Sequence, residues 1–365
     1  MDVKRIVQND LDRIYNALTS EEKSKFADSI ILLTGCAGFL GFYFLHFLAR
    51  FCEELGISKI IGLDNFISGY PQWITELEKQ KNILFYDFNV ITDDIREIPE
   101  ADKAIFVFHM ASIASPAFYR AYPIETLDAN IWGLRNLLEF YKDLPIKGFL
   151  FFSTSEIYGD PDPKMIPTSE DYRGNVACIG PRACYDESKR VGETICYLFA
   201  EKYNMPVTLV RPFNNYGPGM KLNDKRVPAD FAKAVLENRD IIMFSDGTPT
   251  RTFCYISDAI TGYLKALLYN RFYVFNIGID EPEISIYRLA QFYQKTGQEI
   301  FGYTGKLKFE TSKDINYLKD NPNRRCPDIT RARNLLGYNP QVHIEDGVCY
   351  FLEYIKESIK EELEW

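Results

Sequence analysis

Histidine is scarce in this chain: only His46, His109 and His343 occur among 365 residues. None of them stands at the spacing of a metal-ligand motif, so we expect no metal site. The eight cysteines form no Cys-x-x-Cys pair, which favours the reduced thiols of a cytoplasmic protein over a disulfide scaffold. No run of about eighteen apolar residues is present, so the sequence predicts no membrane span.

The chain also lacks a long basic segment. Its formal net charge is −9, from 42 Lys and Arg residues against 51 Asp and Glu residues. This balance disfavours nucleic acids and anionic membranes, so we expect neither as a partner. Residues 1–29 lack the apolar core of a signal peptide and place Ile6, Leu11, Ile14 and Leu18 at helical spacing. We therefore expect an amphipathic helical extension that packs on the rest of the protein or on a partner.

From residue 30 onward, apolar β-rich runs alternate with helical stretches. Strands that are apolar on both faces and separated by helices are typical of a parallel sheet built from βαβ units. The expected strands span 30–35, 59–64, 82–88, 104–111, 148–155 and 205–214, and the expected helices span 39–55 and 124–143. Beyond residue 215, glycine, proline and charged residues increase. We expect one domain over 30–214 and a smaller α/β lobe over 215–365, which returns some segments to the first domain.

The first strand leads into "TGCAGFLG", a turn with Gly35, Gly38 and Gly41 that opens a helix. Glycines there let backbone amides approach a pyrophosphate at the helix N-terminus, which predicts a Rossmann-type, doubly wound fold that binds a dinucleotide. Asp64 ends the second strand, where a carboxylate accepts bonds from ribose hydroxyls and repels a 2′-phosphate, so NAD is favoured over NADP. Further candidate cofactor contacts are Phe39, Leu40, Asn65, Asp87, Phe88 and Ala111.

A tyrosine and a lysine stand four positions apart in "CYDESKR", at Tyr185 and Lys189. A chain with 24 tyrosines will contain such pairs by chance on helix surfaces. Here, however, "STSEIYG" follows a predicted central strand and places Thr154 at the strand end, where open α/β sheets keep their chemistry. A hydroxyl, a phenol and an ammonium behind a dinucleotide turn indicate hydride transfer, and the ammonium is expected to favour the phenolate.

These motifs resemble the extended short-chain dehydrogenase/reductase superfamily over about residues 30–355. Within it, the chain is similar to the UDP-glucuronate decarboxylases, also called UDP-xylose synthases. The stretches that carry this resemblance are "HMASIASPAFYRAYPIETLDAN" (109–130), "STSEIYGDP" (153–161), "GNVACIGPRACYDESKR" (174–190), "RPFNNYGPGM" (211–220), "TRTFCYISD" (250–258) and "NPNRRCPDI" (321–329).

The resemblance implies oxidation of a nucleotide sugar at C4, loss of the C6 carboxylate as CO2 from the β-keto acid, and reduction by the retained NADH. It assigns hydride transfer to Thr154, Tyr185 and Lys189, and acid/base work to Glu156. Arg325 would pair with the C6 carboxylate. The substrate contacts it implies are Tyr119, Ser155, Asn214, Arg226, Arg251 and Arg325. It also implies a homodimer.

Two positions depart from the usual pattern of these decarboxylases. Gly219 replaces an arginine and Ser188 replaces a glycine. The lost arginine leaves the sugar and the nucleotide base open. A 4-epimerase or a 4,6-dehydratase would make the same 4-ketone. Dehydratases commonly carry an Asp-Glu pair after the threonine, whereas this chain has Ser155-Glu156, which favours decarboxylation. A non-catalytic nucleotide-binding protein is the third alternative, and the intact hydride-transfer residues argue against it.

Overall fold

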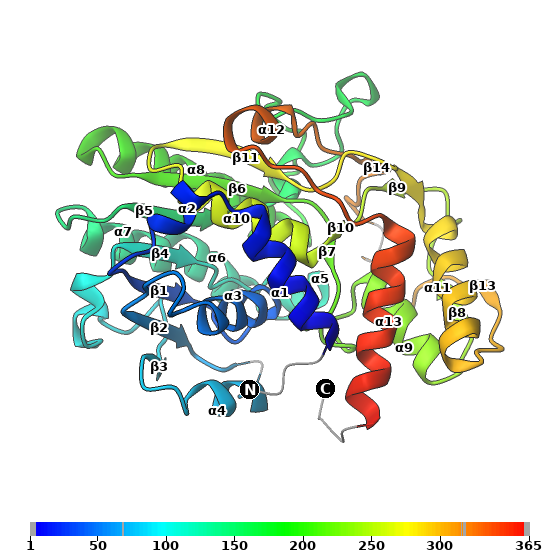
Figure 1. Ribbon diagram of the computed structural model, residues 1–365. Coiled ribbons are helices and arrows are strands. Elements are labelled where there is room, and N and C mark those ends of the chain that lie inside the picture. Colours follow the sequence, from blue (N-terminus) through cyan, green and yellow to red (C-terminus); the bar gives the residue numbers. More distant parts are fainter. Residues whose placement is uncertain (1–4, 68, 315, 317–318, 361–365) are drawn as a thin grey trace.

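The computed structural model describes residues 5–67, 69–314, 316 and 319–360 (Figure 1). Its centre is a seven-stranded sheet with the order β11-β6-β5-β4-β1-β2-β3. Every described pairing in this sheet is parallel. The strands are β1 (Ile30–Thr34), β2 (Lys59–Asp64), β3 (Ile83–Asp87), β4 (Phe106–His109), β5 (Gly148–Phe152), β6 (Val207–Pro212) and β11 (Tyr273–Ile277).

This sheet confirms the predicted fold class. The six strands expected from their apolar, β-rich runs all form; the strand at 59–64 has the expected bounds, and the other five are shorter by one to four residues. Side chains of the central strands are buried, as expected when helices cover both faces of a parallel sheet. The seventh strand, β11, was not identified individually from the sequence. It pairs with β6 at the sheet edge, although about sixty residues separate the two strands in the chain.

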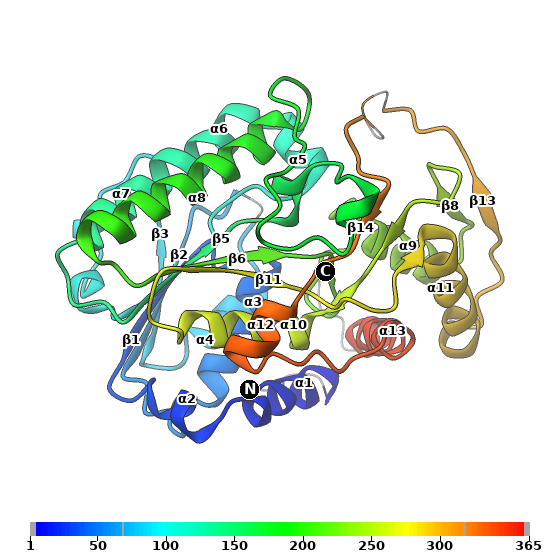
Figure 2. The ribbon, with the colours of Figure 1, turned by 90° about the horizontal axis from the view of Figure 1, so that it is seen from above.

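Helices cover both faces of the sheet (Figure 2). One layer contains α5 (Pro116–Ala121), α6 (Pro123–Asp128), the π turn η3 (Ala129–Gly133), α7 (Leu134–Tyr141) and α8 (Ala183–Tyr203). The other contains α3 (Phe39–Arg50), α4 (Gln72–Leu77), α10 (Ile256–Leu267) and α12 (Thr330–Leu336), with α1 (Arg5–Ala17) and α2 (Ser20–Ser24) outside them. Single 3₁₀ turns are η1 (Ile95–Glu97), η2 (Ala101–Lys103), η4 (Ser155–Tyr158) and η5 (Pro163–Met165).

Both predicted helices differ from the structure. The helix expected over 39–55 ends at Arg50, and the chain then turns to reach Gly56, which has a positive φ of 65°. The helix expected over 124–143 is interrupted by the π turn η3. Inside that turn, the buried Asn130 donates to the Ser188 hydroxyl at 2.9 Å. Ser188, one of the two unusual positions, therefore joins α8 to the π turn, and π turns commonly mark functional sites.

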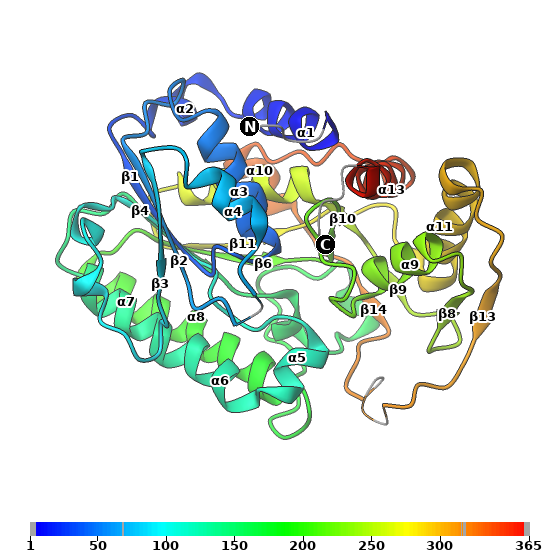
Figure 3. The same cartoon turned by 90° about the horizontal axis from the view of Figure 1, so that it is seen from below.

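A smaller lobe stands beside the carboxyl ends of the strands (Figure 3). It contains the short pairs β7·β10 and β8·β13 and the three-stranded sheet β12-β9-β14. Its elements are β7 (Asn215–Tyr216), α9 (Val227–Leu236), β8 (Ile241–Met243), β9 (Thr250–Arg251), β10 (Cys254–Tyr255), β12 (Ile284–Ser285), α11 (Ile286–Phe301), β13 (Leu307–Phe309), β14 (Arg324–Arg325) and α13 (Ile344–Lys360). The polar groups described below lie in the region between this lobe and the large sheet.

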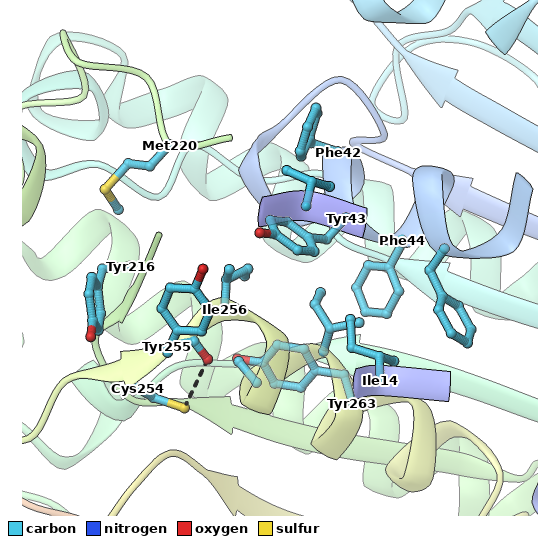
Figure 4. Packing of buried hydrophobic residues seen from close by; sticks show 14 of the residues in the cluster. Ile14, Phe42, Tyr43, Phe44, Tyr216, Met220, Cys254, Tyr255, Ile256 and Tyr263 are labelled. Atoms are coloured by element: carbon cyan, nitrogen blue, oxygen red, sulfur yellow. Dashed lines mark hydrogen bonds between the residues drawn. The ribbon is translucent and has the colours of Figure 1, made fainter. Parts of the chain in front are cut away.

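The N-terminal helix α1 packs against α3, α10 and α13. Its apolar face belongs to the main hydrophobic core, in which Ile14 is a member together with Tyr43 and Tyr255 (Figure 4). The same helix buries Asp10, whose carboxylate accepts from the hydroxyls of Tyr43 at 2.8 Å and Tyr255 at 2.7 Å. Arg13 donates to it at 3.0 Å. Burial raises the pKa of Asp10 to about 6. The Asp10 carboxylate thus connects α3, through Tyr43, to β10 of the small lobe, through Tyr255.

Replacing Asp10 by alanine should lower the free energy of unfolding by about 3 kcal/mol, because buried tyrosine hydroxyls lose their acceptor. Thermal denaturation measures this loss. The matched control is Asp12→Ala on the same helix, whose carboxylate pairs with Arg50 at 2.7 Å in an exposed position. Exposed pairs contribute little, so that variant should stay within about 0.5 kcal/mol of the parent. Equal effects of the two changes would contradict this account.

Candidate active site

In the glycine turn between β1 and α3, neighbouring backbone atoms leave no room for a side chain at Gly35 or Gly41. A Cβ at Gly41 would lie 2.0 Å from the Cys36 carbonyl oxygen, and one at Gly35 would lie 2.6 Å from the Ala111 nitrogen. Gly38 is the N-cap of α3 and supplies no side-chain bond to the helix amides. The amides at this helix start are therefore suited to an anion such as the NAD pyrophosphate.

Asp64 lies at the carboxyl end of β2, beside this turn. Its two oxygens accept from the backbone amides of Ala37 and Phe66, each at 2.9 Å, which fixes the carboxylate at the strand end. Burial raises its pKa. Asp87 stands in register with it on β3. Among the other candidate cofactor contacts, Asn65 and Asp87 are exposed, Phe39 and Leu40 are half-buried beside Gly41, Phe88 is buried, and Ala111 follows β4. These positions fit NAD.

Thr154, Tyr185 and Lys189 come together between the end of β5 and the first turns of α8. The Thr154 hydroxyl hydrogen-bonds to the Tyr185 phenol. Lys189 Nζ donates to the Phe152 carbonyl oxygen at 2.7 Å and lies 5.9 Å from the centroid of the Tyr185 ring. All three side chains are buried. The helix and the strand end therefore converge as the sequence led us to expect.

The charge state of this group differs from our expectation. Burial raises the pKa of Tyr185 to about 12, and the bond to Thr154 offsets this only in part. Burial also lowers the pKa of Lys189 to about 7. The expected lowering of the Tyr185 pKa by Lys189 is thus absent from this structure, because burial disfavours both charged forms. Nearby, His109 contacts the Thr34 hydroxyl at 2.8 Å, and burial lowers its pKa to about 3, so it stays neutral.

A carboxylate surrounded by arginines lies next to Tyr185. Glu156 accepts from Nη2 of Arg182 and from Nη2 of Arg325, each at 2.5 Å. Arg251 adds a third positive charge nearby. Burial alone would raise the pKa of Glu156, but the three arginines outweigh it and hold the pKa well below the usual range. The cluster therefore carries excess positive charge that is suited to a second carboxylate.

Arg182 and its neighbour Asp186 are members of this cluster that our sequence reasoning missed. Arg182 is the N-cap residue of α8, three positions before Tyr185, and its Nε lies 3.5 Å from an Asp186 oxygen. Helical spacing places Arg182, Tyr185 and Asp186 around one turn. That spacing in "GPRACYD", read together with Glu156, was the available signal.

The remaining candidate substrate contacts surround this centre. Tyr119 stacks on Tyr185 with ring centroids 5.0 Å apart, and its hydroxyl has no hydrogen-bond partner among the described residues. Asn214 donates to the Thr252 carbonyl oxygen at 2.8 Å and accepts from Arg325 at 3.4 Å. Ser155 is buried at the start of η4.

The two other predicted arginines are held in different ways. Arg251 donates to three backbone carbonyl oxygens, including that of Asn323 at 3.0 Å, so its guanidinium group is fixed beside β14. Burial and Arg325 lower its pKa to about 9. Arg226 pairs with Asp224 and lies over the ring of Phe39, 5.8 Å from its centroid, next to the glycine turn.

The second unusual position, Gly219, has a positive φ of 80°. A Cβ there would lie 2.6 Å from Cδ1 of Phe42, on helix α3. Phe42 therefore occupies the space beside Gly219, and the backbone conformation is one that side chains rarely adopt. An arginine at this position would require both the turn and Phe42 to move.

No group of three or more His, Cys, Asp or Glu side chains arranged to hold a metal ion occurs among the described residues. In the part of the chain that the structure describes, no helix is both long and apolar enough to cross a membrane.

A Rossmann-type sheet, a glycine turn that fits NAD and a Tyr-x-x-x-Lys pair at the strand ends together define an NAD-dependent enzyme of the dehydrogenase/reductase class. The chain belongs to the NAD dependent epimerase/dehydratase family, whose model matches residues 31–278. It is 34% identical over 330 residues to UDP-glucuronic acid decarboxylase 1 of Xenopus tropicalis, across 90% of this chain and 73% of that protein. UDP-glucuronic acid decarboxylase 5 of Arabidopsis thaliana is 33% identical over 329 residues, across 89% of each. The resemblance inferred from the motifs is thereby confirmed.

Solved structures agree with this family. UDP-glucose 4-epimerase from Thermotoga maritima, with UDP-glucose, matches with a TM-score of 0.76 and 28% identity over 90% of this chain and 99% of that one. UDP-glucuronic acid 4-epimerase from Bacillus cereus, in complex with UDP-glucuronic acid and NAD, matches with a TM-score of 0.74 and 26% identity over the same shares.

Proposed function

We propose that this protein decarboxylates UDP-glucuronate to UDP-xylose. The observation that carries the proposal is the half-buried Glu156, held between Arg182 and Arg325 beside Tyr185. Nε of Arg325 and the hydroxyl of Tyr119 are buried without hydrogen-bond partners among the described residues. Unpaired donors in a positively charged pocket are suited to the C6 carboxylate of a uronate. The decarboxylase relatives support the same substrate.

The glycine turn and Asp64 would hold NAD, which would supply a reversible hydride acceptor for C4 of the sugar. Tyr185 exchanges the proton of the C4 hydroxyl group, and Thr154 orients the phenol. Lys189 holds the strand end through its bond to the Phe152 carbonyl oxygen. Burial keeps the Tyr185 phenol protonated, and we expect substrate and cofactor binding to lower its pKa.

Glu156 would change its role as the uronate binds. The arginines that lower its pKa turn toward the C6 carboxylate, so Glu156 loses part of their stabilising charge and binds a proton more readily. It is then placed to protonate C5 after the C5–C6 bond breaks. Arg325 meanwhile holds the leaving carboxylate against the ketone.

The deciding experiment incubates the purified protein with NAD and UDP-glucuronate and identifies the products by NMR and mass spectrometry. We expect CO2 release and a UDP-pentose. An unchanged mass with an inverted C4 centre would identify a UDP-glucuronate 4-epimerase, which is the alternative that the Bacillus cereus relative favours. An unchanged substrate would contradict both readings and direct attention to the altered surroundings of Gly219.

We also propose that the protein forms a homodimer through α6, η3 and α8. Large apolar side chains are exposed there: Ile124 at 66%, Trp132 at 51% and Leu198 at 56%. Val191 and Leu198 are both exposed and lie two turns apart on one face of α8. An apolar face on adjacent helices is typical of an interface between copies.

Changing Trp132 to glutamate should convert the dimer to a monomer, because a charge would be buried in an apolar interface. Light scattering coupled to size-exclusion chromatography measures the molar mass. Phe309→Glu is the matched control: Phe309 is 53% exposed, but lies on β13 in the small lobe. A dimer in the first variant, or dissociation in both, would contradict this interface.

The domain boundaries and the cellular location follow as further proposals. Residues 30–214 would bind NAD and residues 215–365 would contribute mainly to the nucleotide-sugar site, with α10 and β11 returning to the large sheet. All eight cysteines are free thiols, which is consistent with a reducing, cytoplasmic compartment.

A further inference from the structure

A cavity adjoins the arginine cluster. It has a volume of about 370 Å³, and Thr154, Glu156 and Tyr185 are not among its lining residues. We call it the side cavity, and its polar lining comprises Asp160, Asn175, Arg182, Asp186, Asp320 and Asn321. Arg182 and Asp186 belong both to this lining and to the Glu156 cluster. They therefore stand between the side cavity and the reacting centre.

Asp186 is the unusual group in this boundary. The residue is only 4% exposed, and its Oδ1 has no hydrogen-bond partner among the described residues. Its Oδ2 lies 3.5 Å from Nε of Arg182, while Nη2 of the same guanidinium group donates to Glu156 at 2.5 Å. Nε and Nη2 present their protons along one edge of the group, so both carboxylates face that edge.

Asp186 also responds to the charge on Glu156. Burial raises the pKa of Asp186, and the negative charge of Glu156 raises it further, whereas Arg182 and Arg325 lower it. Two interacting carboxylates share protons rather than titrate independently. The other titratable groups that face Asp186 are Tyr119, Cys184, Tyr185, Asp160 and Asp320.

The proposed reaction consumes one proton per turnover. The C5–C6 bond breaks, C6 leaves as CO2, and its electron pair remains at C5 in conjugation with the C4 ketone. A new C5–H bond then forms with a proton. The hydride removed from C4 returns to C4, and the C4 hydroxyl proton is removed and restored. Every other transfer cancels, so the proton at C5 must come from solvent while cofactor and sugar nucleotide fill the main site.

We propose that Asp186 relays this proton, taking it from water in the side cavity and passing it to Glu156 at the shared edge of Arg182. The inference rests on the proposed decarboxylase function and names the route that this function requires. Asp186 acts through Glu156 and does not touch the sugar, so it is a positioning residue rather than a catalytic residue. Its unpaired Oδ1 is the oxygen available to water from the side cavity.

The test compares the parent enzyme with Asp186→Asn, which keeps the size of the side chain but cannot carry the proton. We expect kcat to fall about tenfold, less than the loss of a direct acid/base group, because Glu156 still donates to C5. The solvent deuterium isotope effect on kcat should rise, since proton delivery becomes limiting. The KM for UDP-glucuronate and the formation of NADH in a single turnover should remain near the parent values.

Asp186→Ala adds a second readout, because it opens space for a small acid. Formate or acetate should restore kcat in a concentration-dependent way in this variant and leave the parent unaffected. The matched control is Glu187→Gln, the next residue of α8, whose carboxylate pairs with Arg190 at 3.5 Å. It should retain parental kcat and isotope effect.

The outcomes separate the relay from the function. An unchanged kcat and isotope effect in Asp186→Asn would overturn the relay while CO2 release by the parent enzyme still upheld the decarboxylase. Slow variants with a raised KM and no rescue by small acids would show a structural role and also overturn it. If the parent enzyme releases no CO2, no net proton is needed, and the relay falls together with the proposed function.

Discussion

A Tyr185→Phe variant is expected to bind NAD normally and to lose about 10³-fold in kcat. The change removes only the phenol oxygen, so the stacking with Tyr119 and the buried position on α8 remain. Without that oxygen, no group bonded to Thr154 exchanges the proton of the C4 hydroxyl. Absorbance of NADH after rapid mixing with UDP-glucuronate measures the hydride-transfer step directly.

The matched control is Tyr197→Phe. Tyr197 lies on the same helix, is 48% exposed and is remote from the strand ends. It should show parental rates. If Tyr185→Phe turned over near the parental rate, Tyr185 would not be the proton-exchanging group, whatever its position in the site.

An Arg325→Ala variant should lose about 10³-fold in kcat/KM for UDP-glucuronate, as when a preorganised donor to a reacting group is removed. Arg325 contributes one of the two charged bonds to Glu156 and carries an unpaired Nε toward the proposed carboxylate site. Its loss therefore weakens uronate binding and leaves Glu156 with one charged hydrogen bond, from Arg182. Release of CO2 is the measurement.

Arg324→Ala provides the comparison, because Arg324 is the neighbouring residue of β14 and pairs with Glu283 at 2.6 Å outside the cluster. It should stay near the parental kcat/KM. Arg325→Lys should recover little activity, since a point charge cannot span two acceptors as a planar guanidinium group does. Parental kinetics in Arg325→Ala would assign this arginine another role.

Most of the sheet was predictable because each of its first six strands appears in the sequence as a short, strongly apolar run. A glycine turn after the first strand and polar residues after the later ones then placed the chemistry at one edge. β11 escaped notice because its partner β6 lies far away in sequence, and only tertiary pairing makes it part of the large sheet. The π turn between α6 and α7 contains Asn130, which donates to Ser188 on another helix, a contact that no local pattern shows.

The positions of the site residues that belong to a sequence motif were predictable. The protonation states of these groups were not, because they depend on burial and on charges from other segments. Thr154, Tyr185 and Lys189 lie together as their spacing indicated. The Tyr185 pKa rises because the group is buried, and burial depends on the surrounding fold rather than on the neighbouring lysine. Arg182 and Asp186 acquire significance only because Glu156, from a different segment, meets them. The roles of all these residues remain predictions.

The N-terminal helix limits where this chain can be truncated and where chimeras with its relatives can be joined. The family model begins to match at residue 31, yet Val7, Leu11 and Ile14 are fully buried in the main core. A chain shortened to begin at Ile30 would leave an apolar groove over α3, α10 and α13 and two buried tyrosine hydroxyls without Asp10. Such a chain should aggregate when expressed, and chimeras with relatives should exchange α1 together with Tyr43 and Tyr255. Those three pieces form one packing unit that crosses the start of the family match at residue 31.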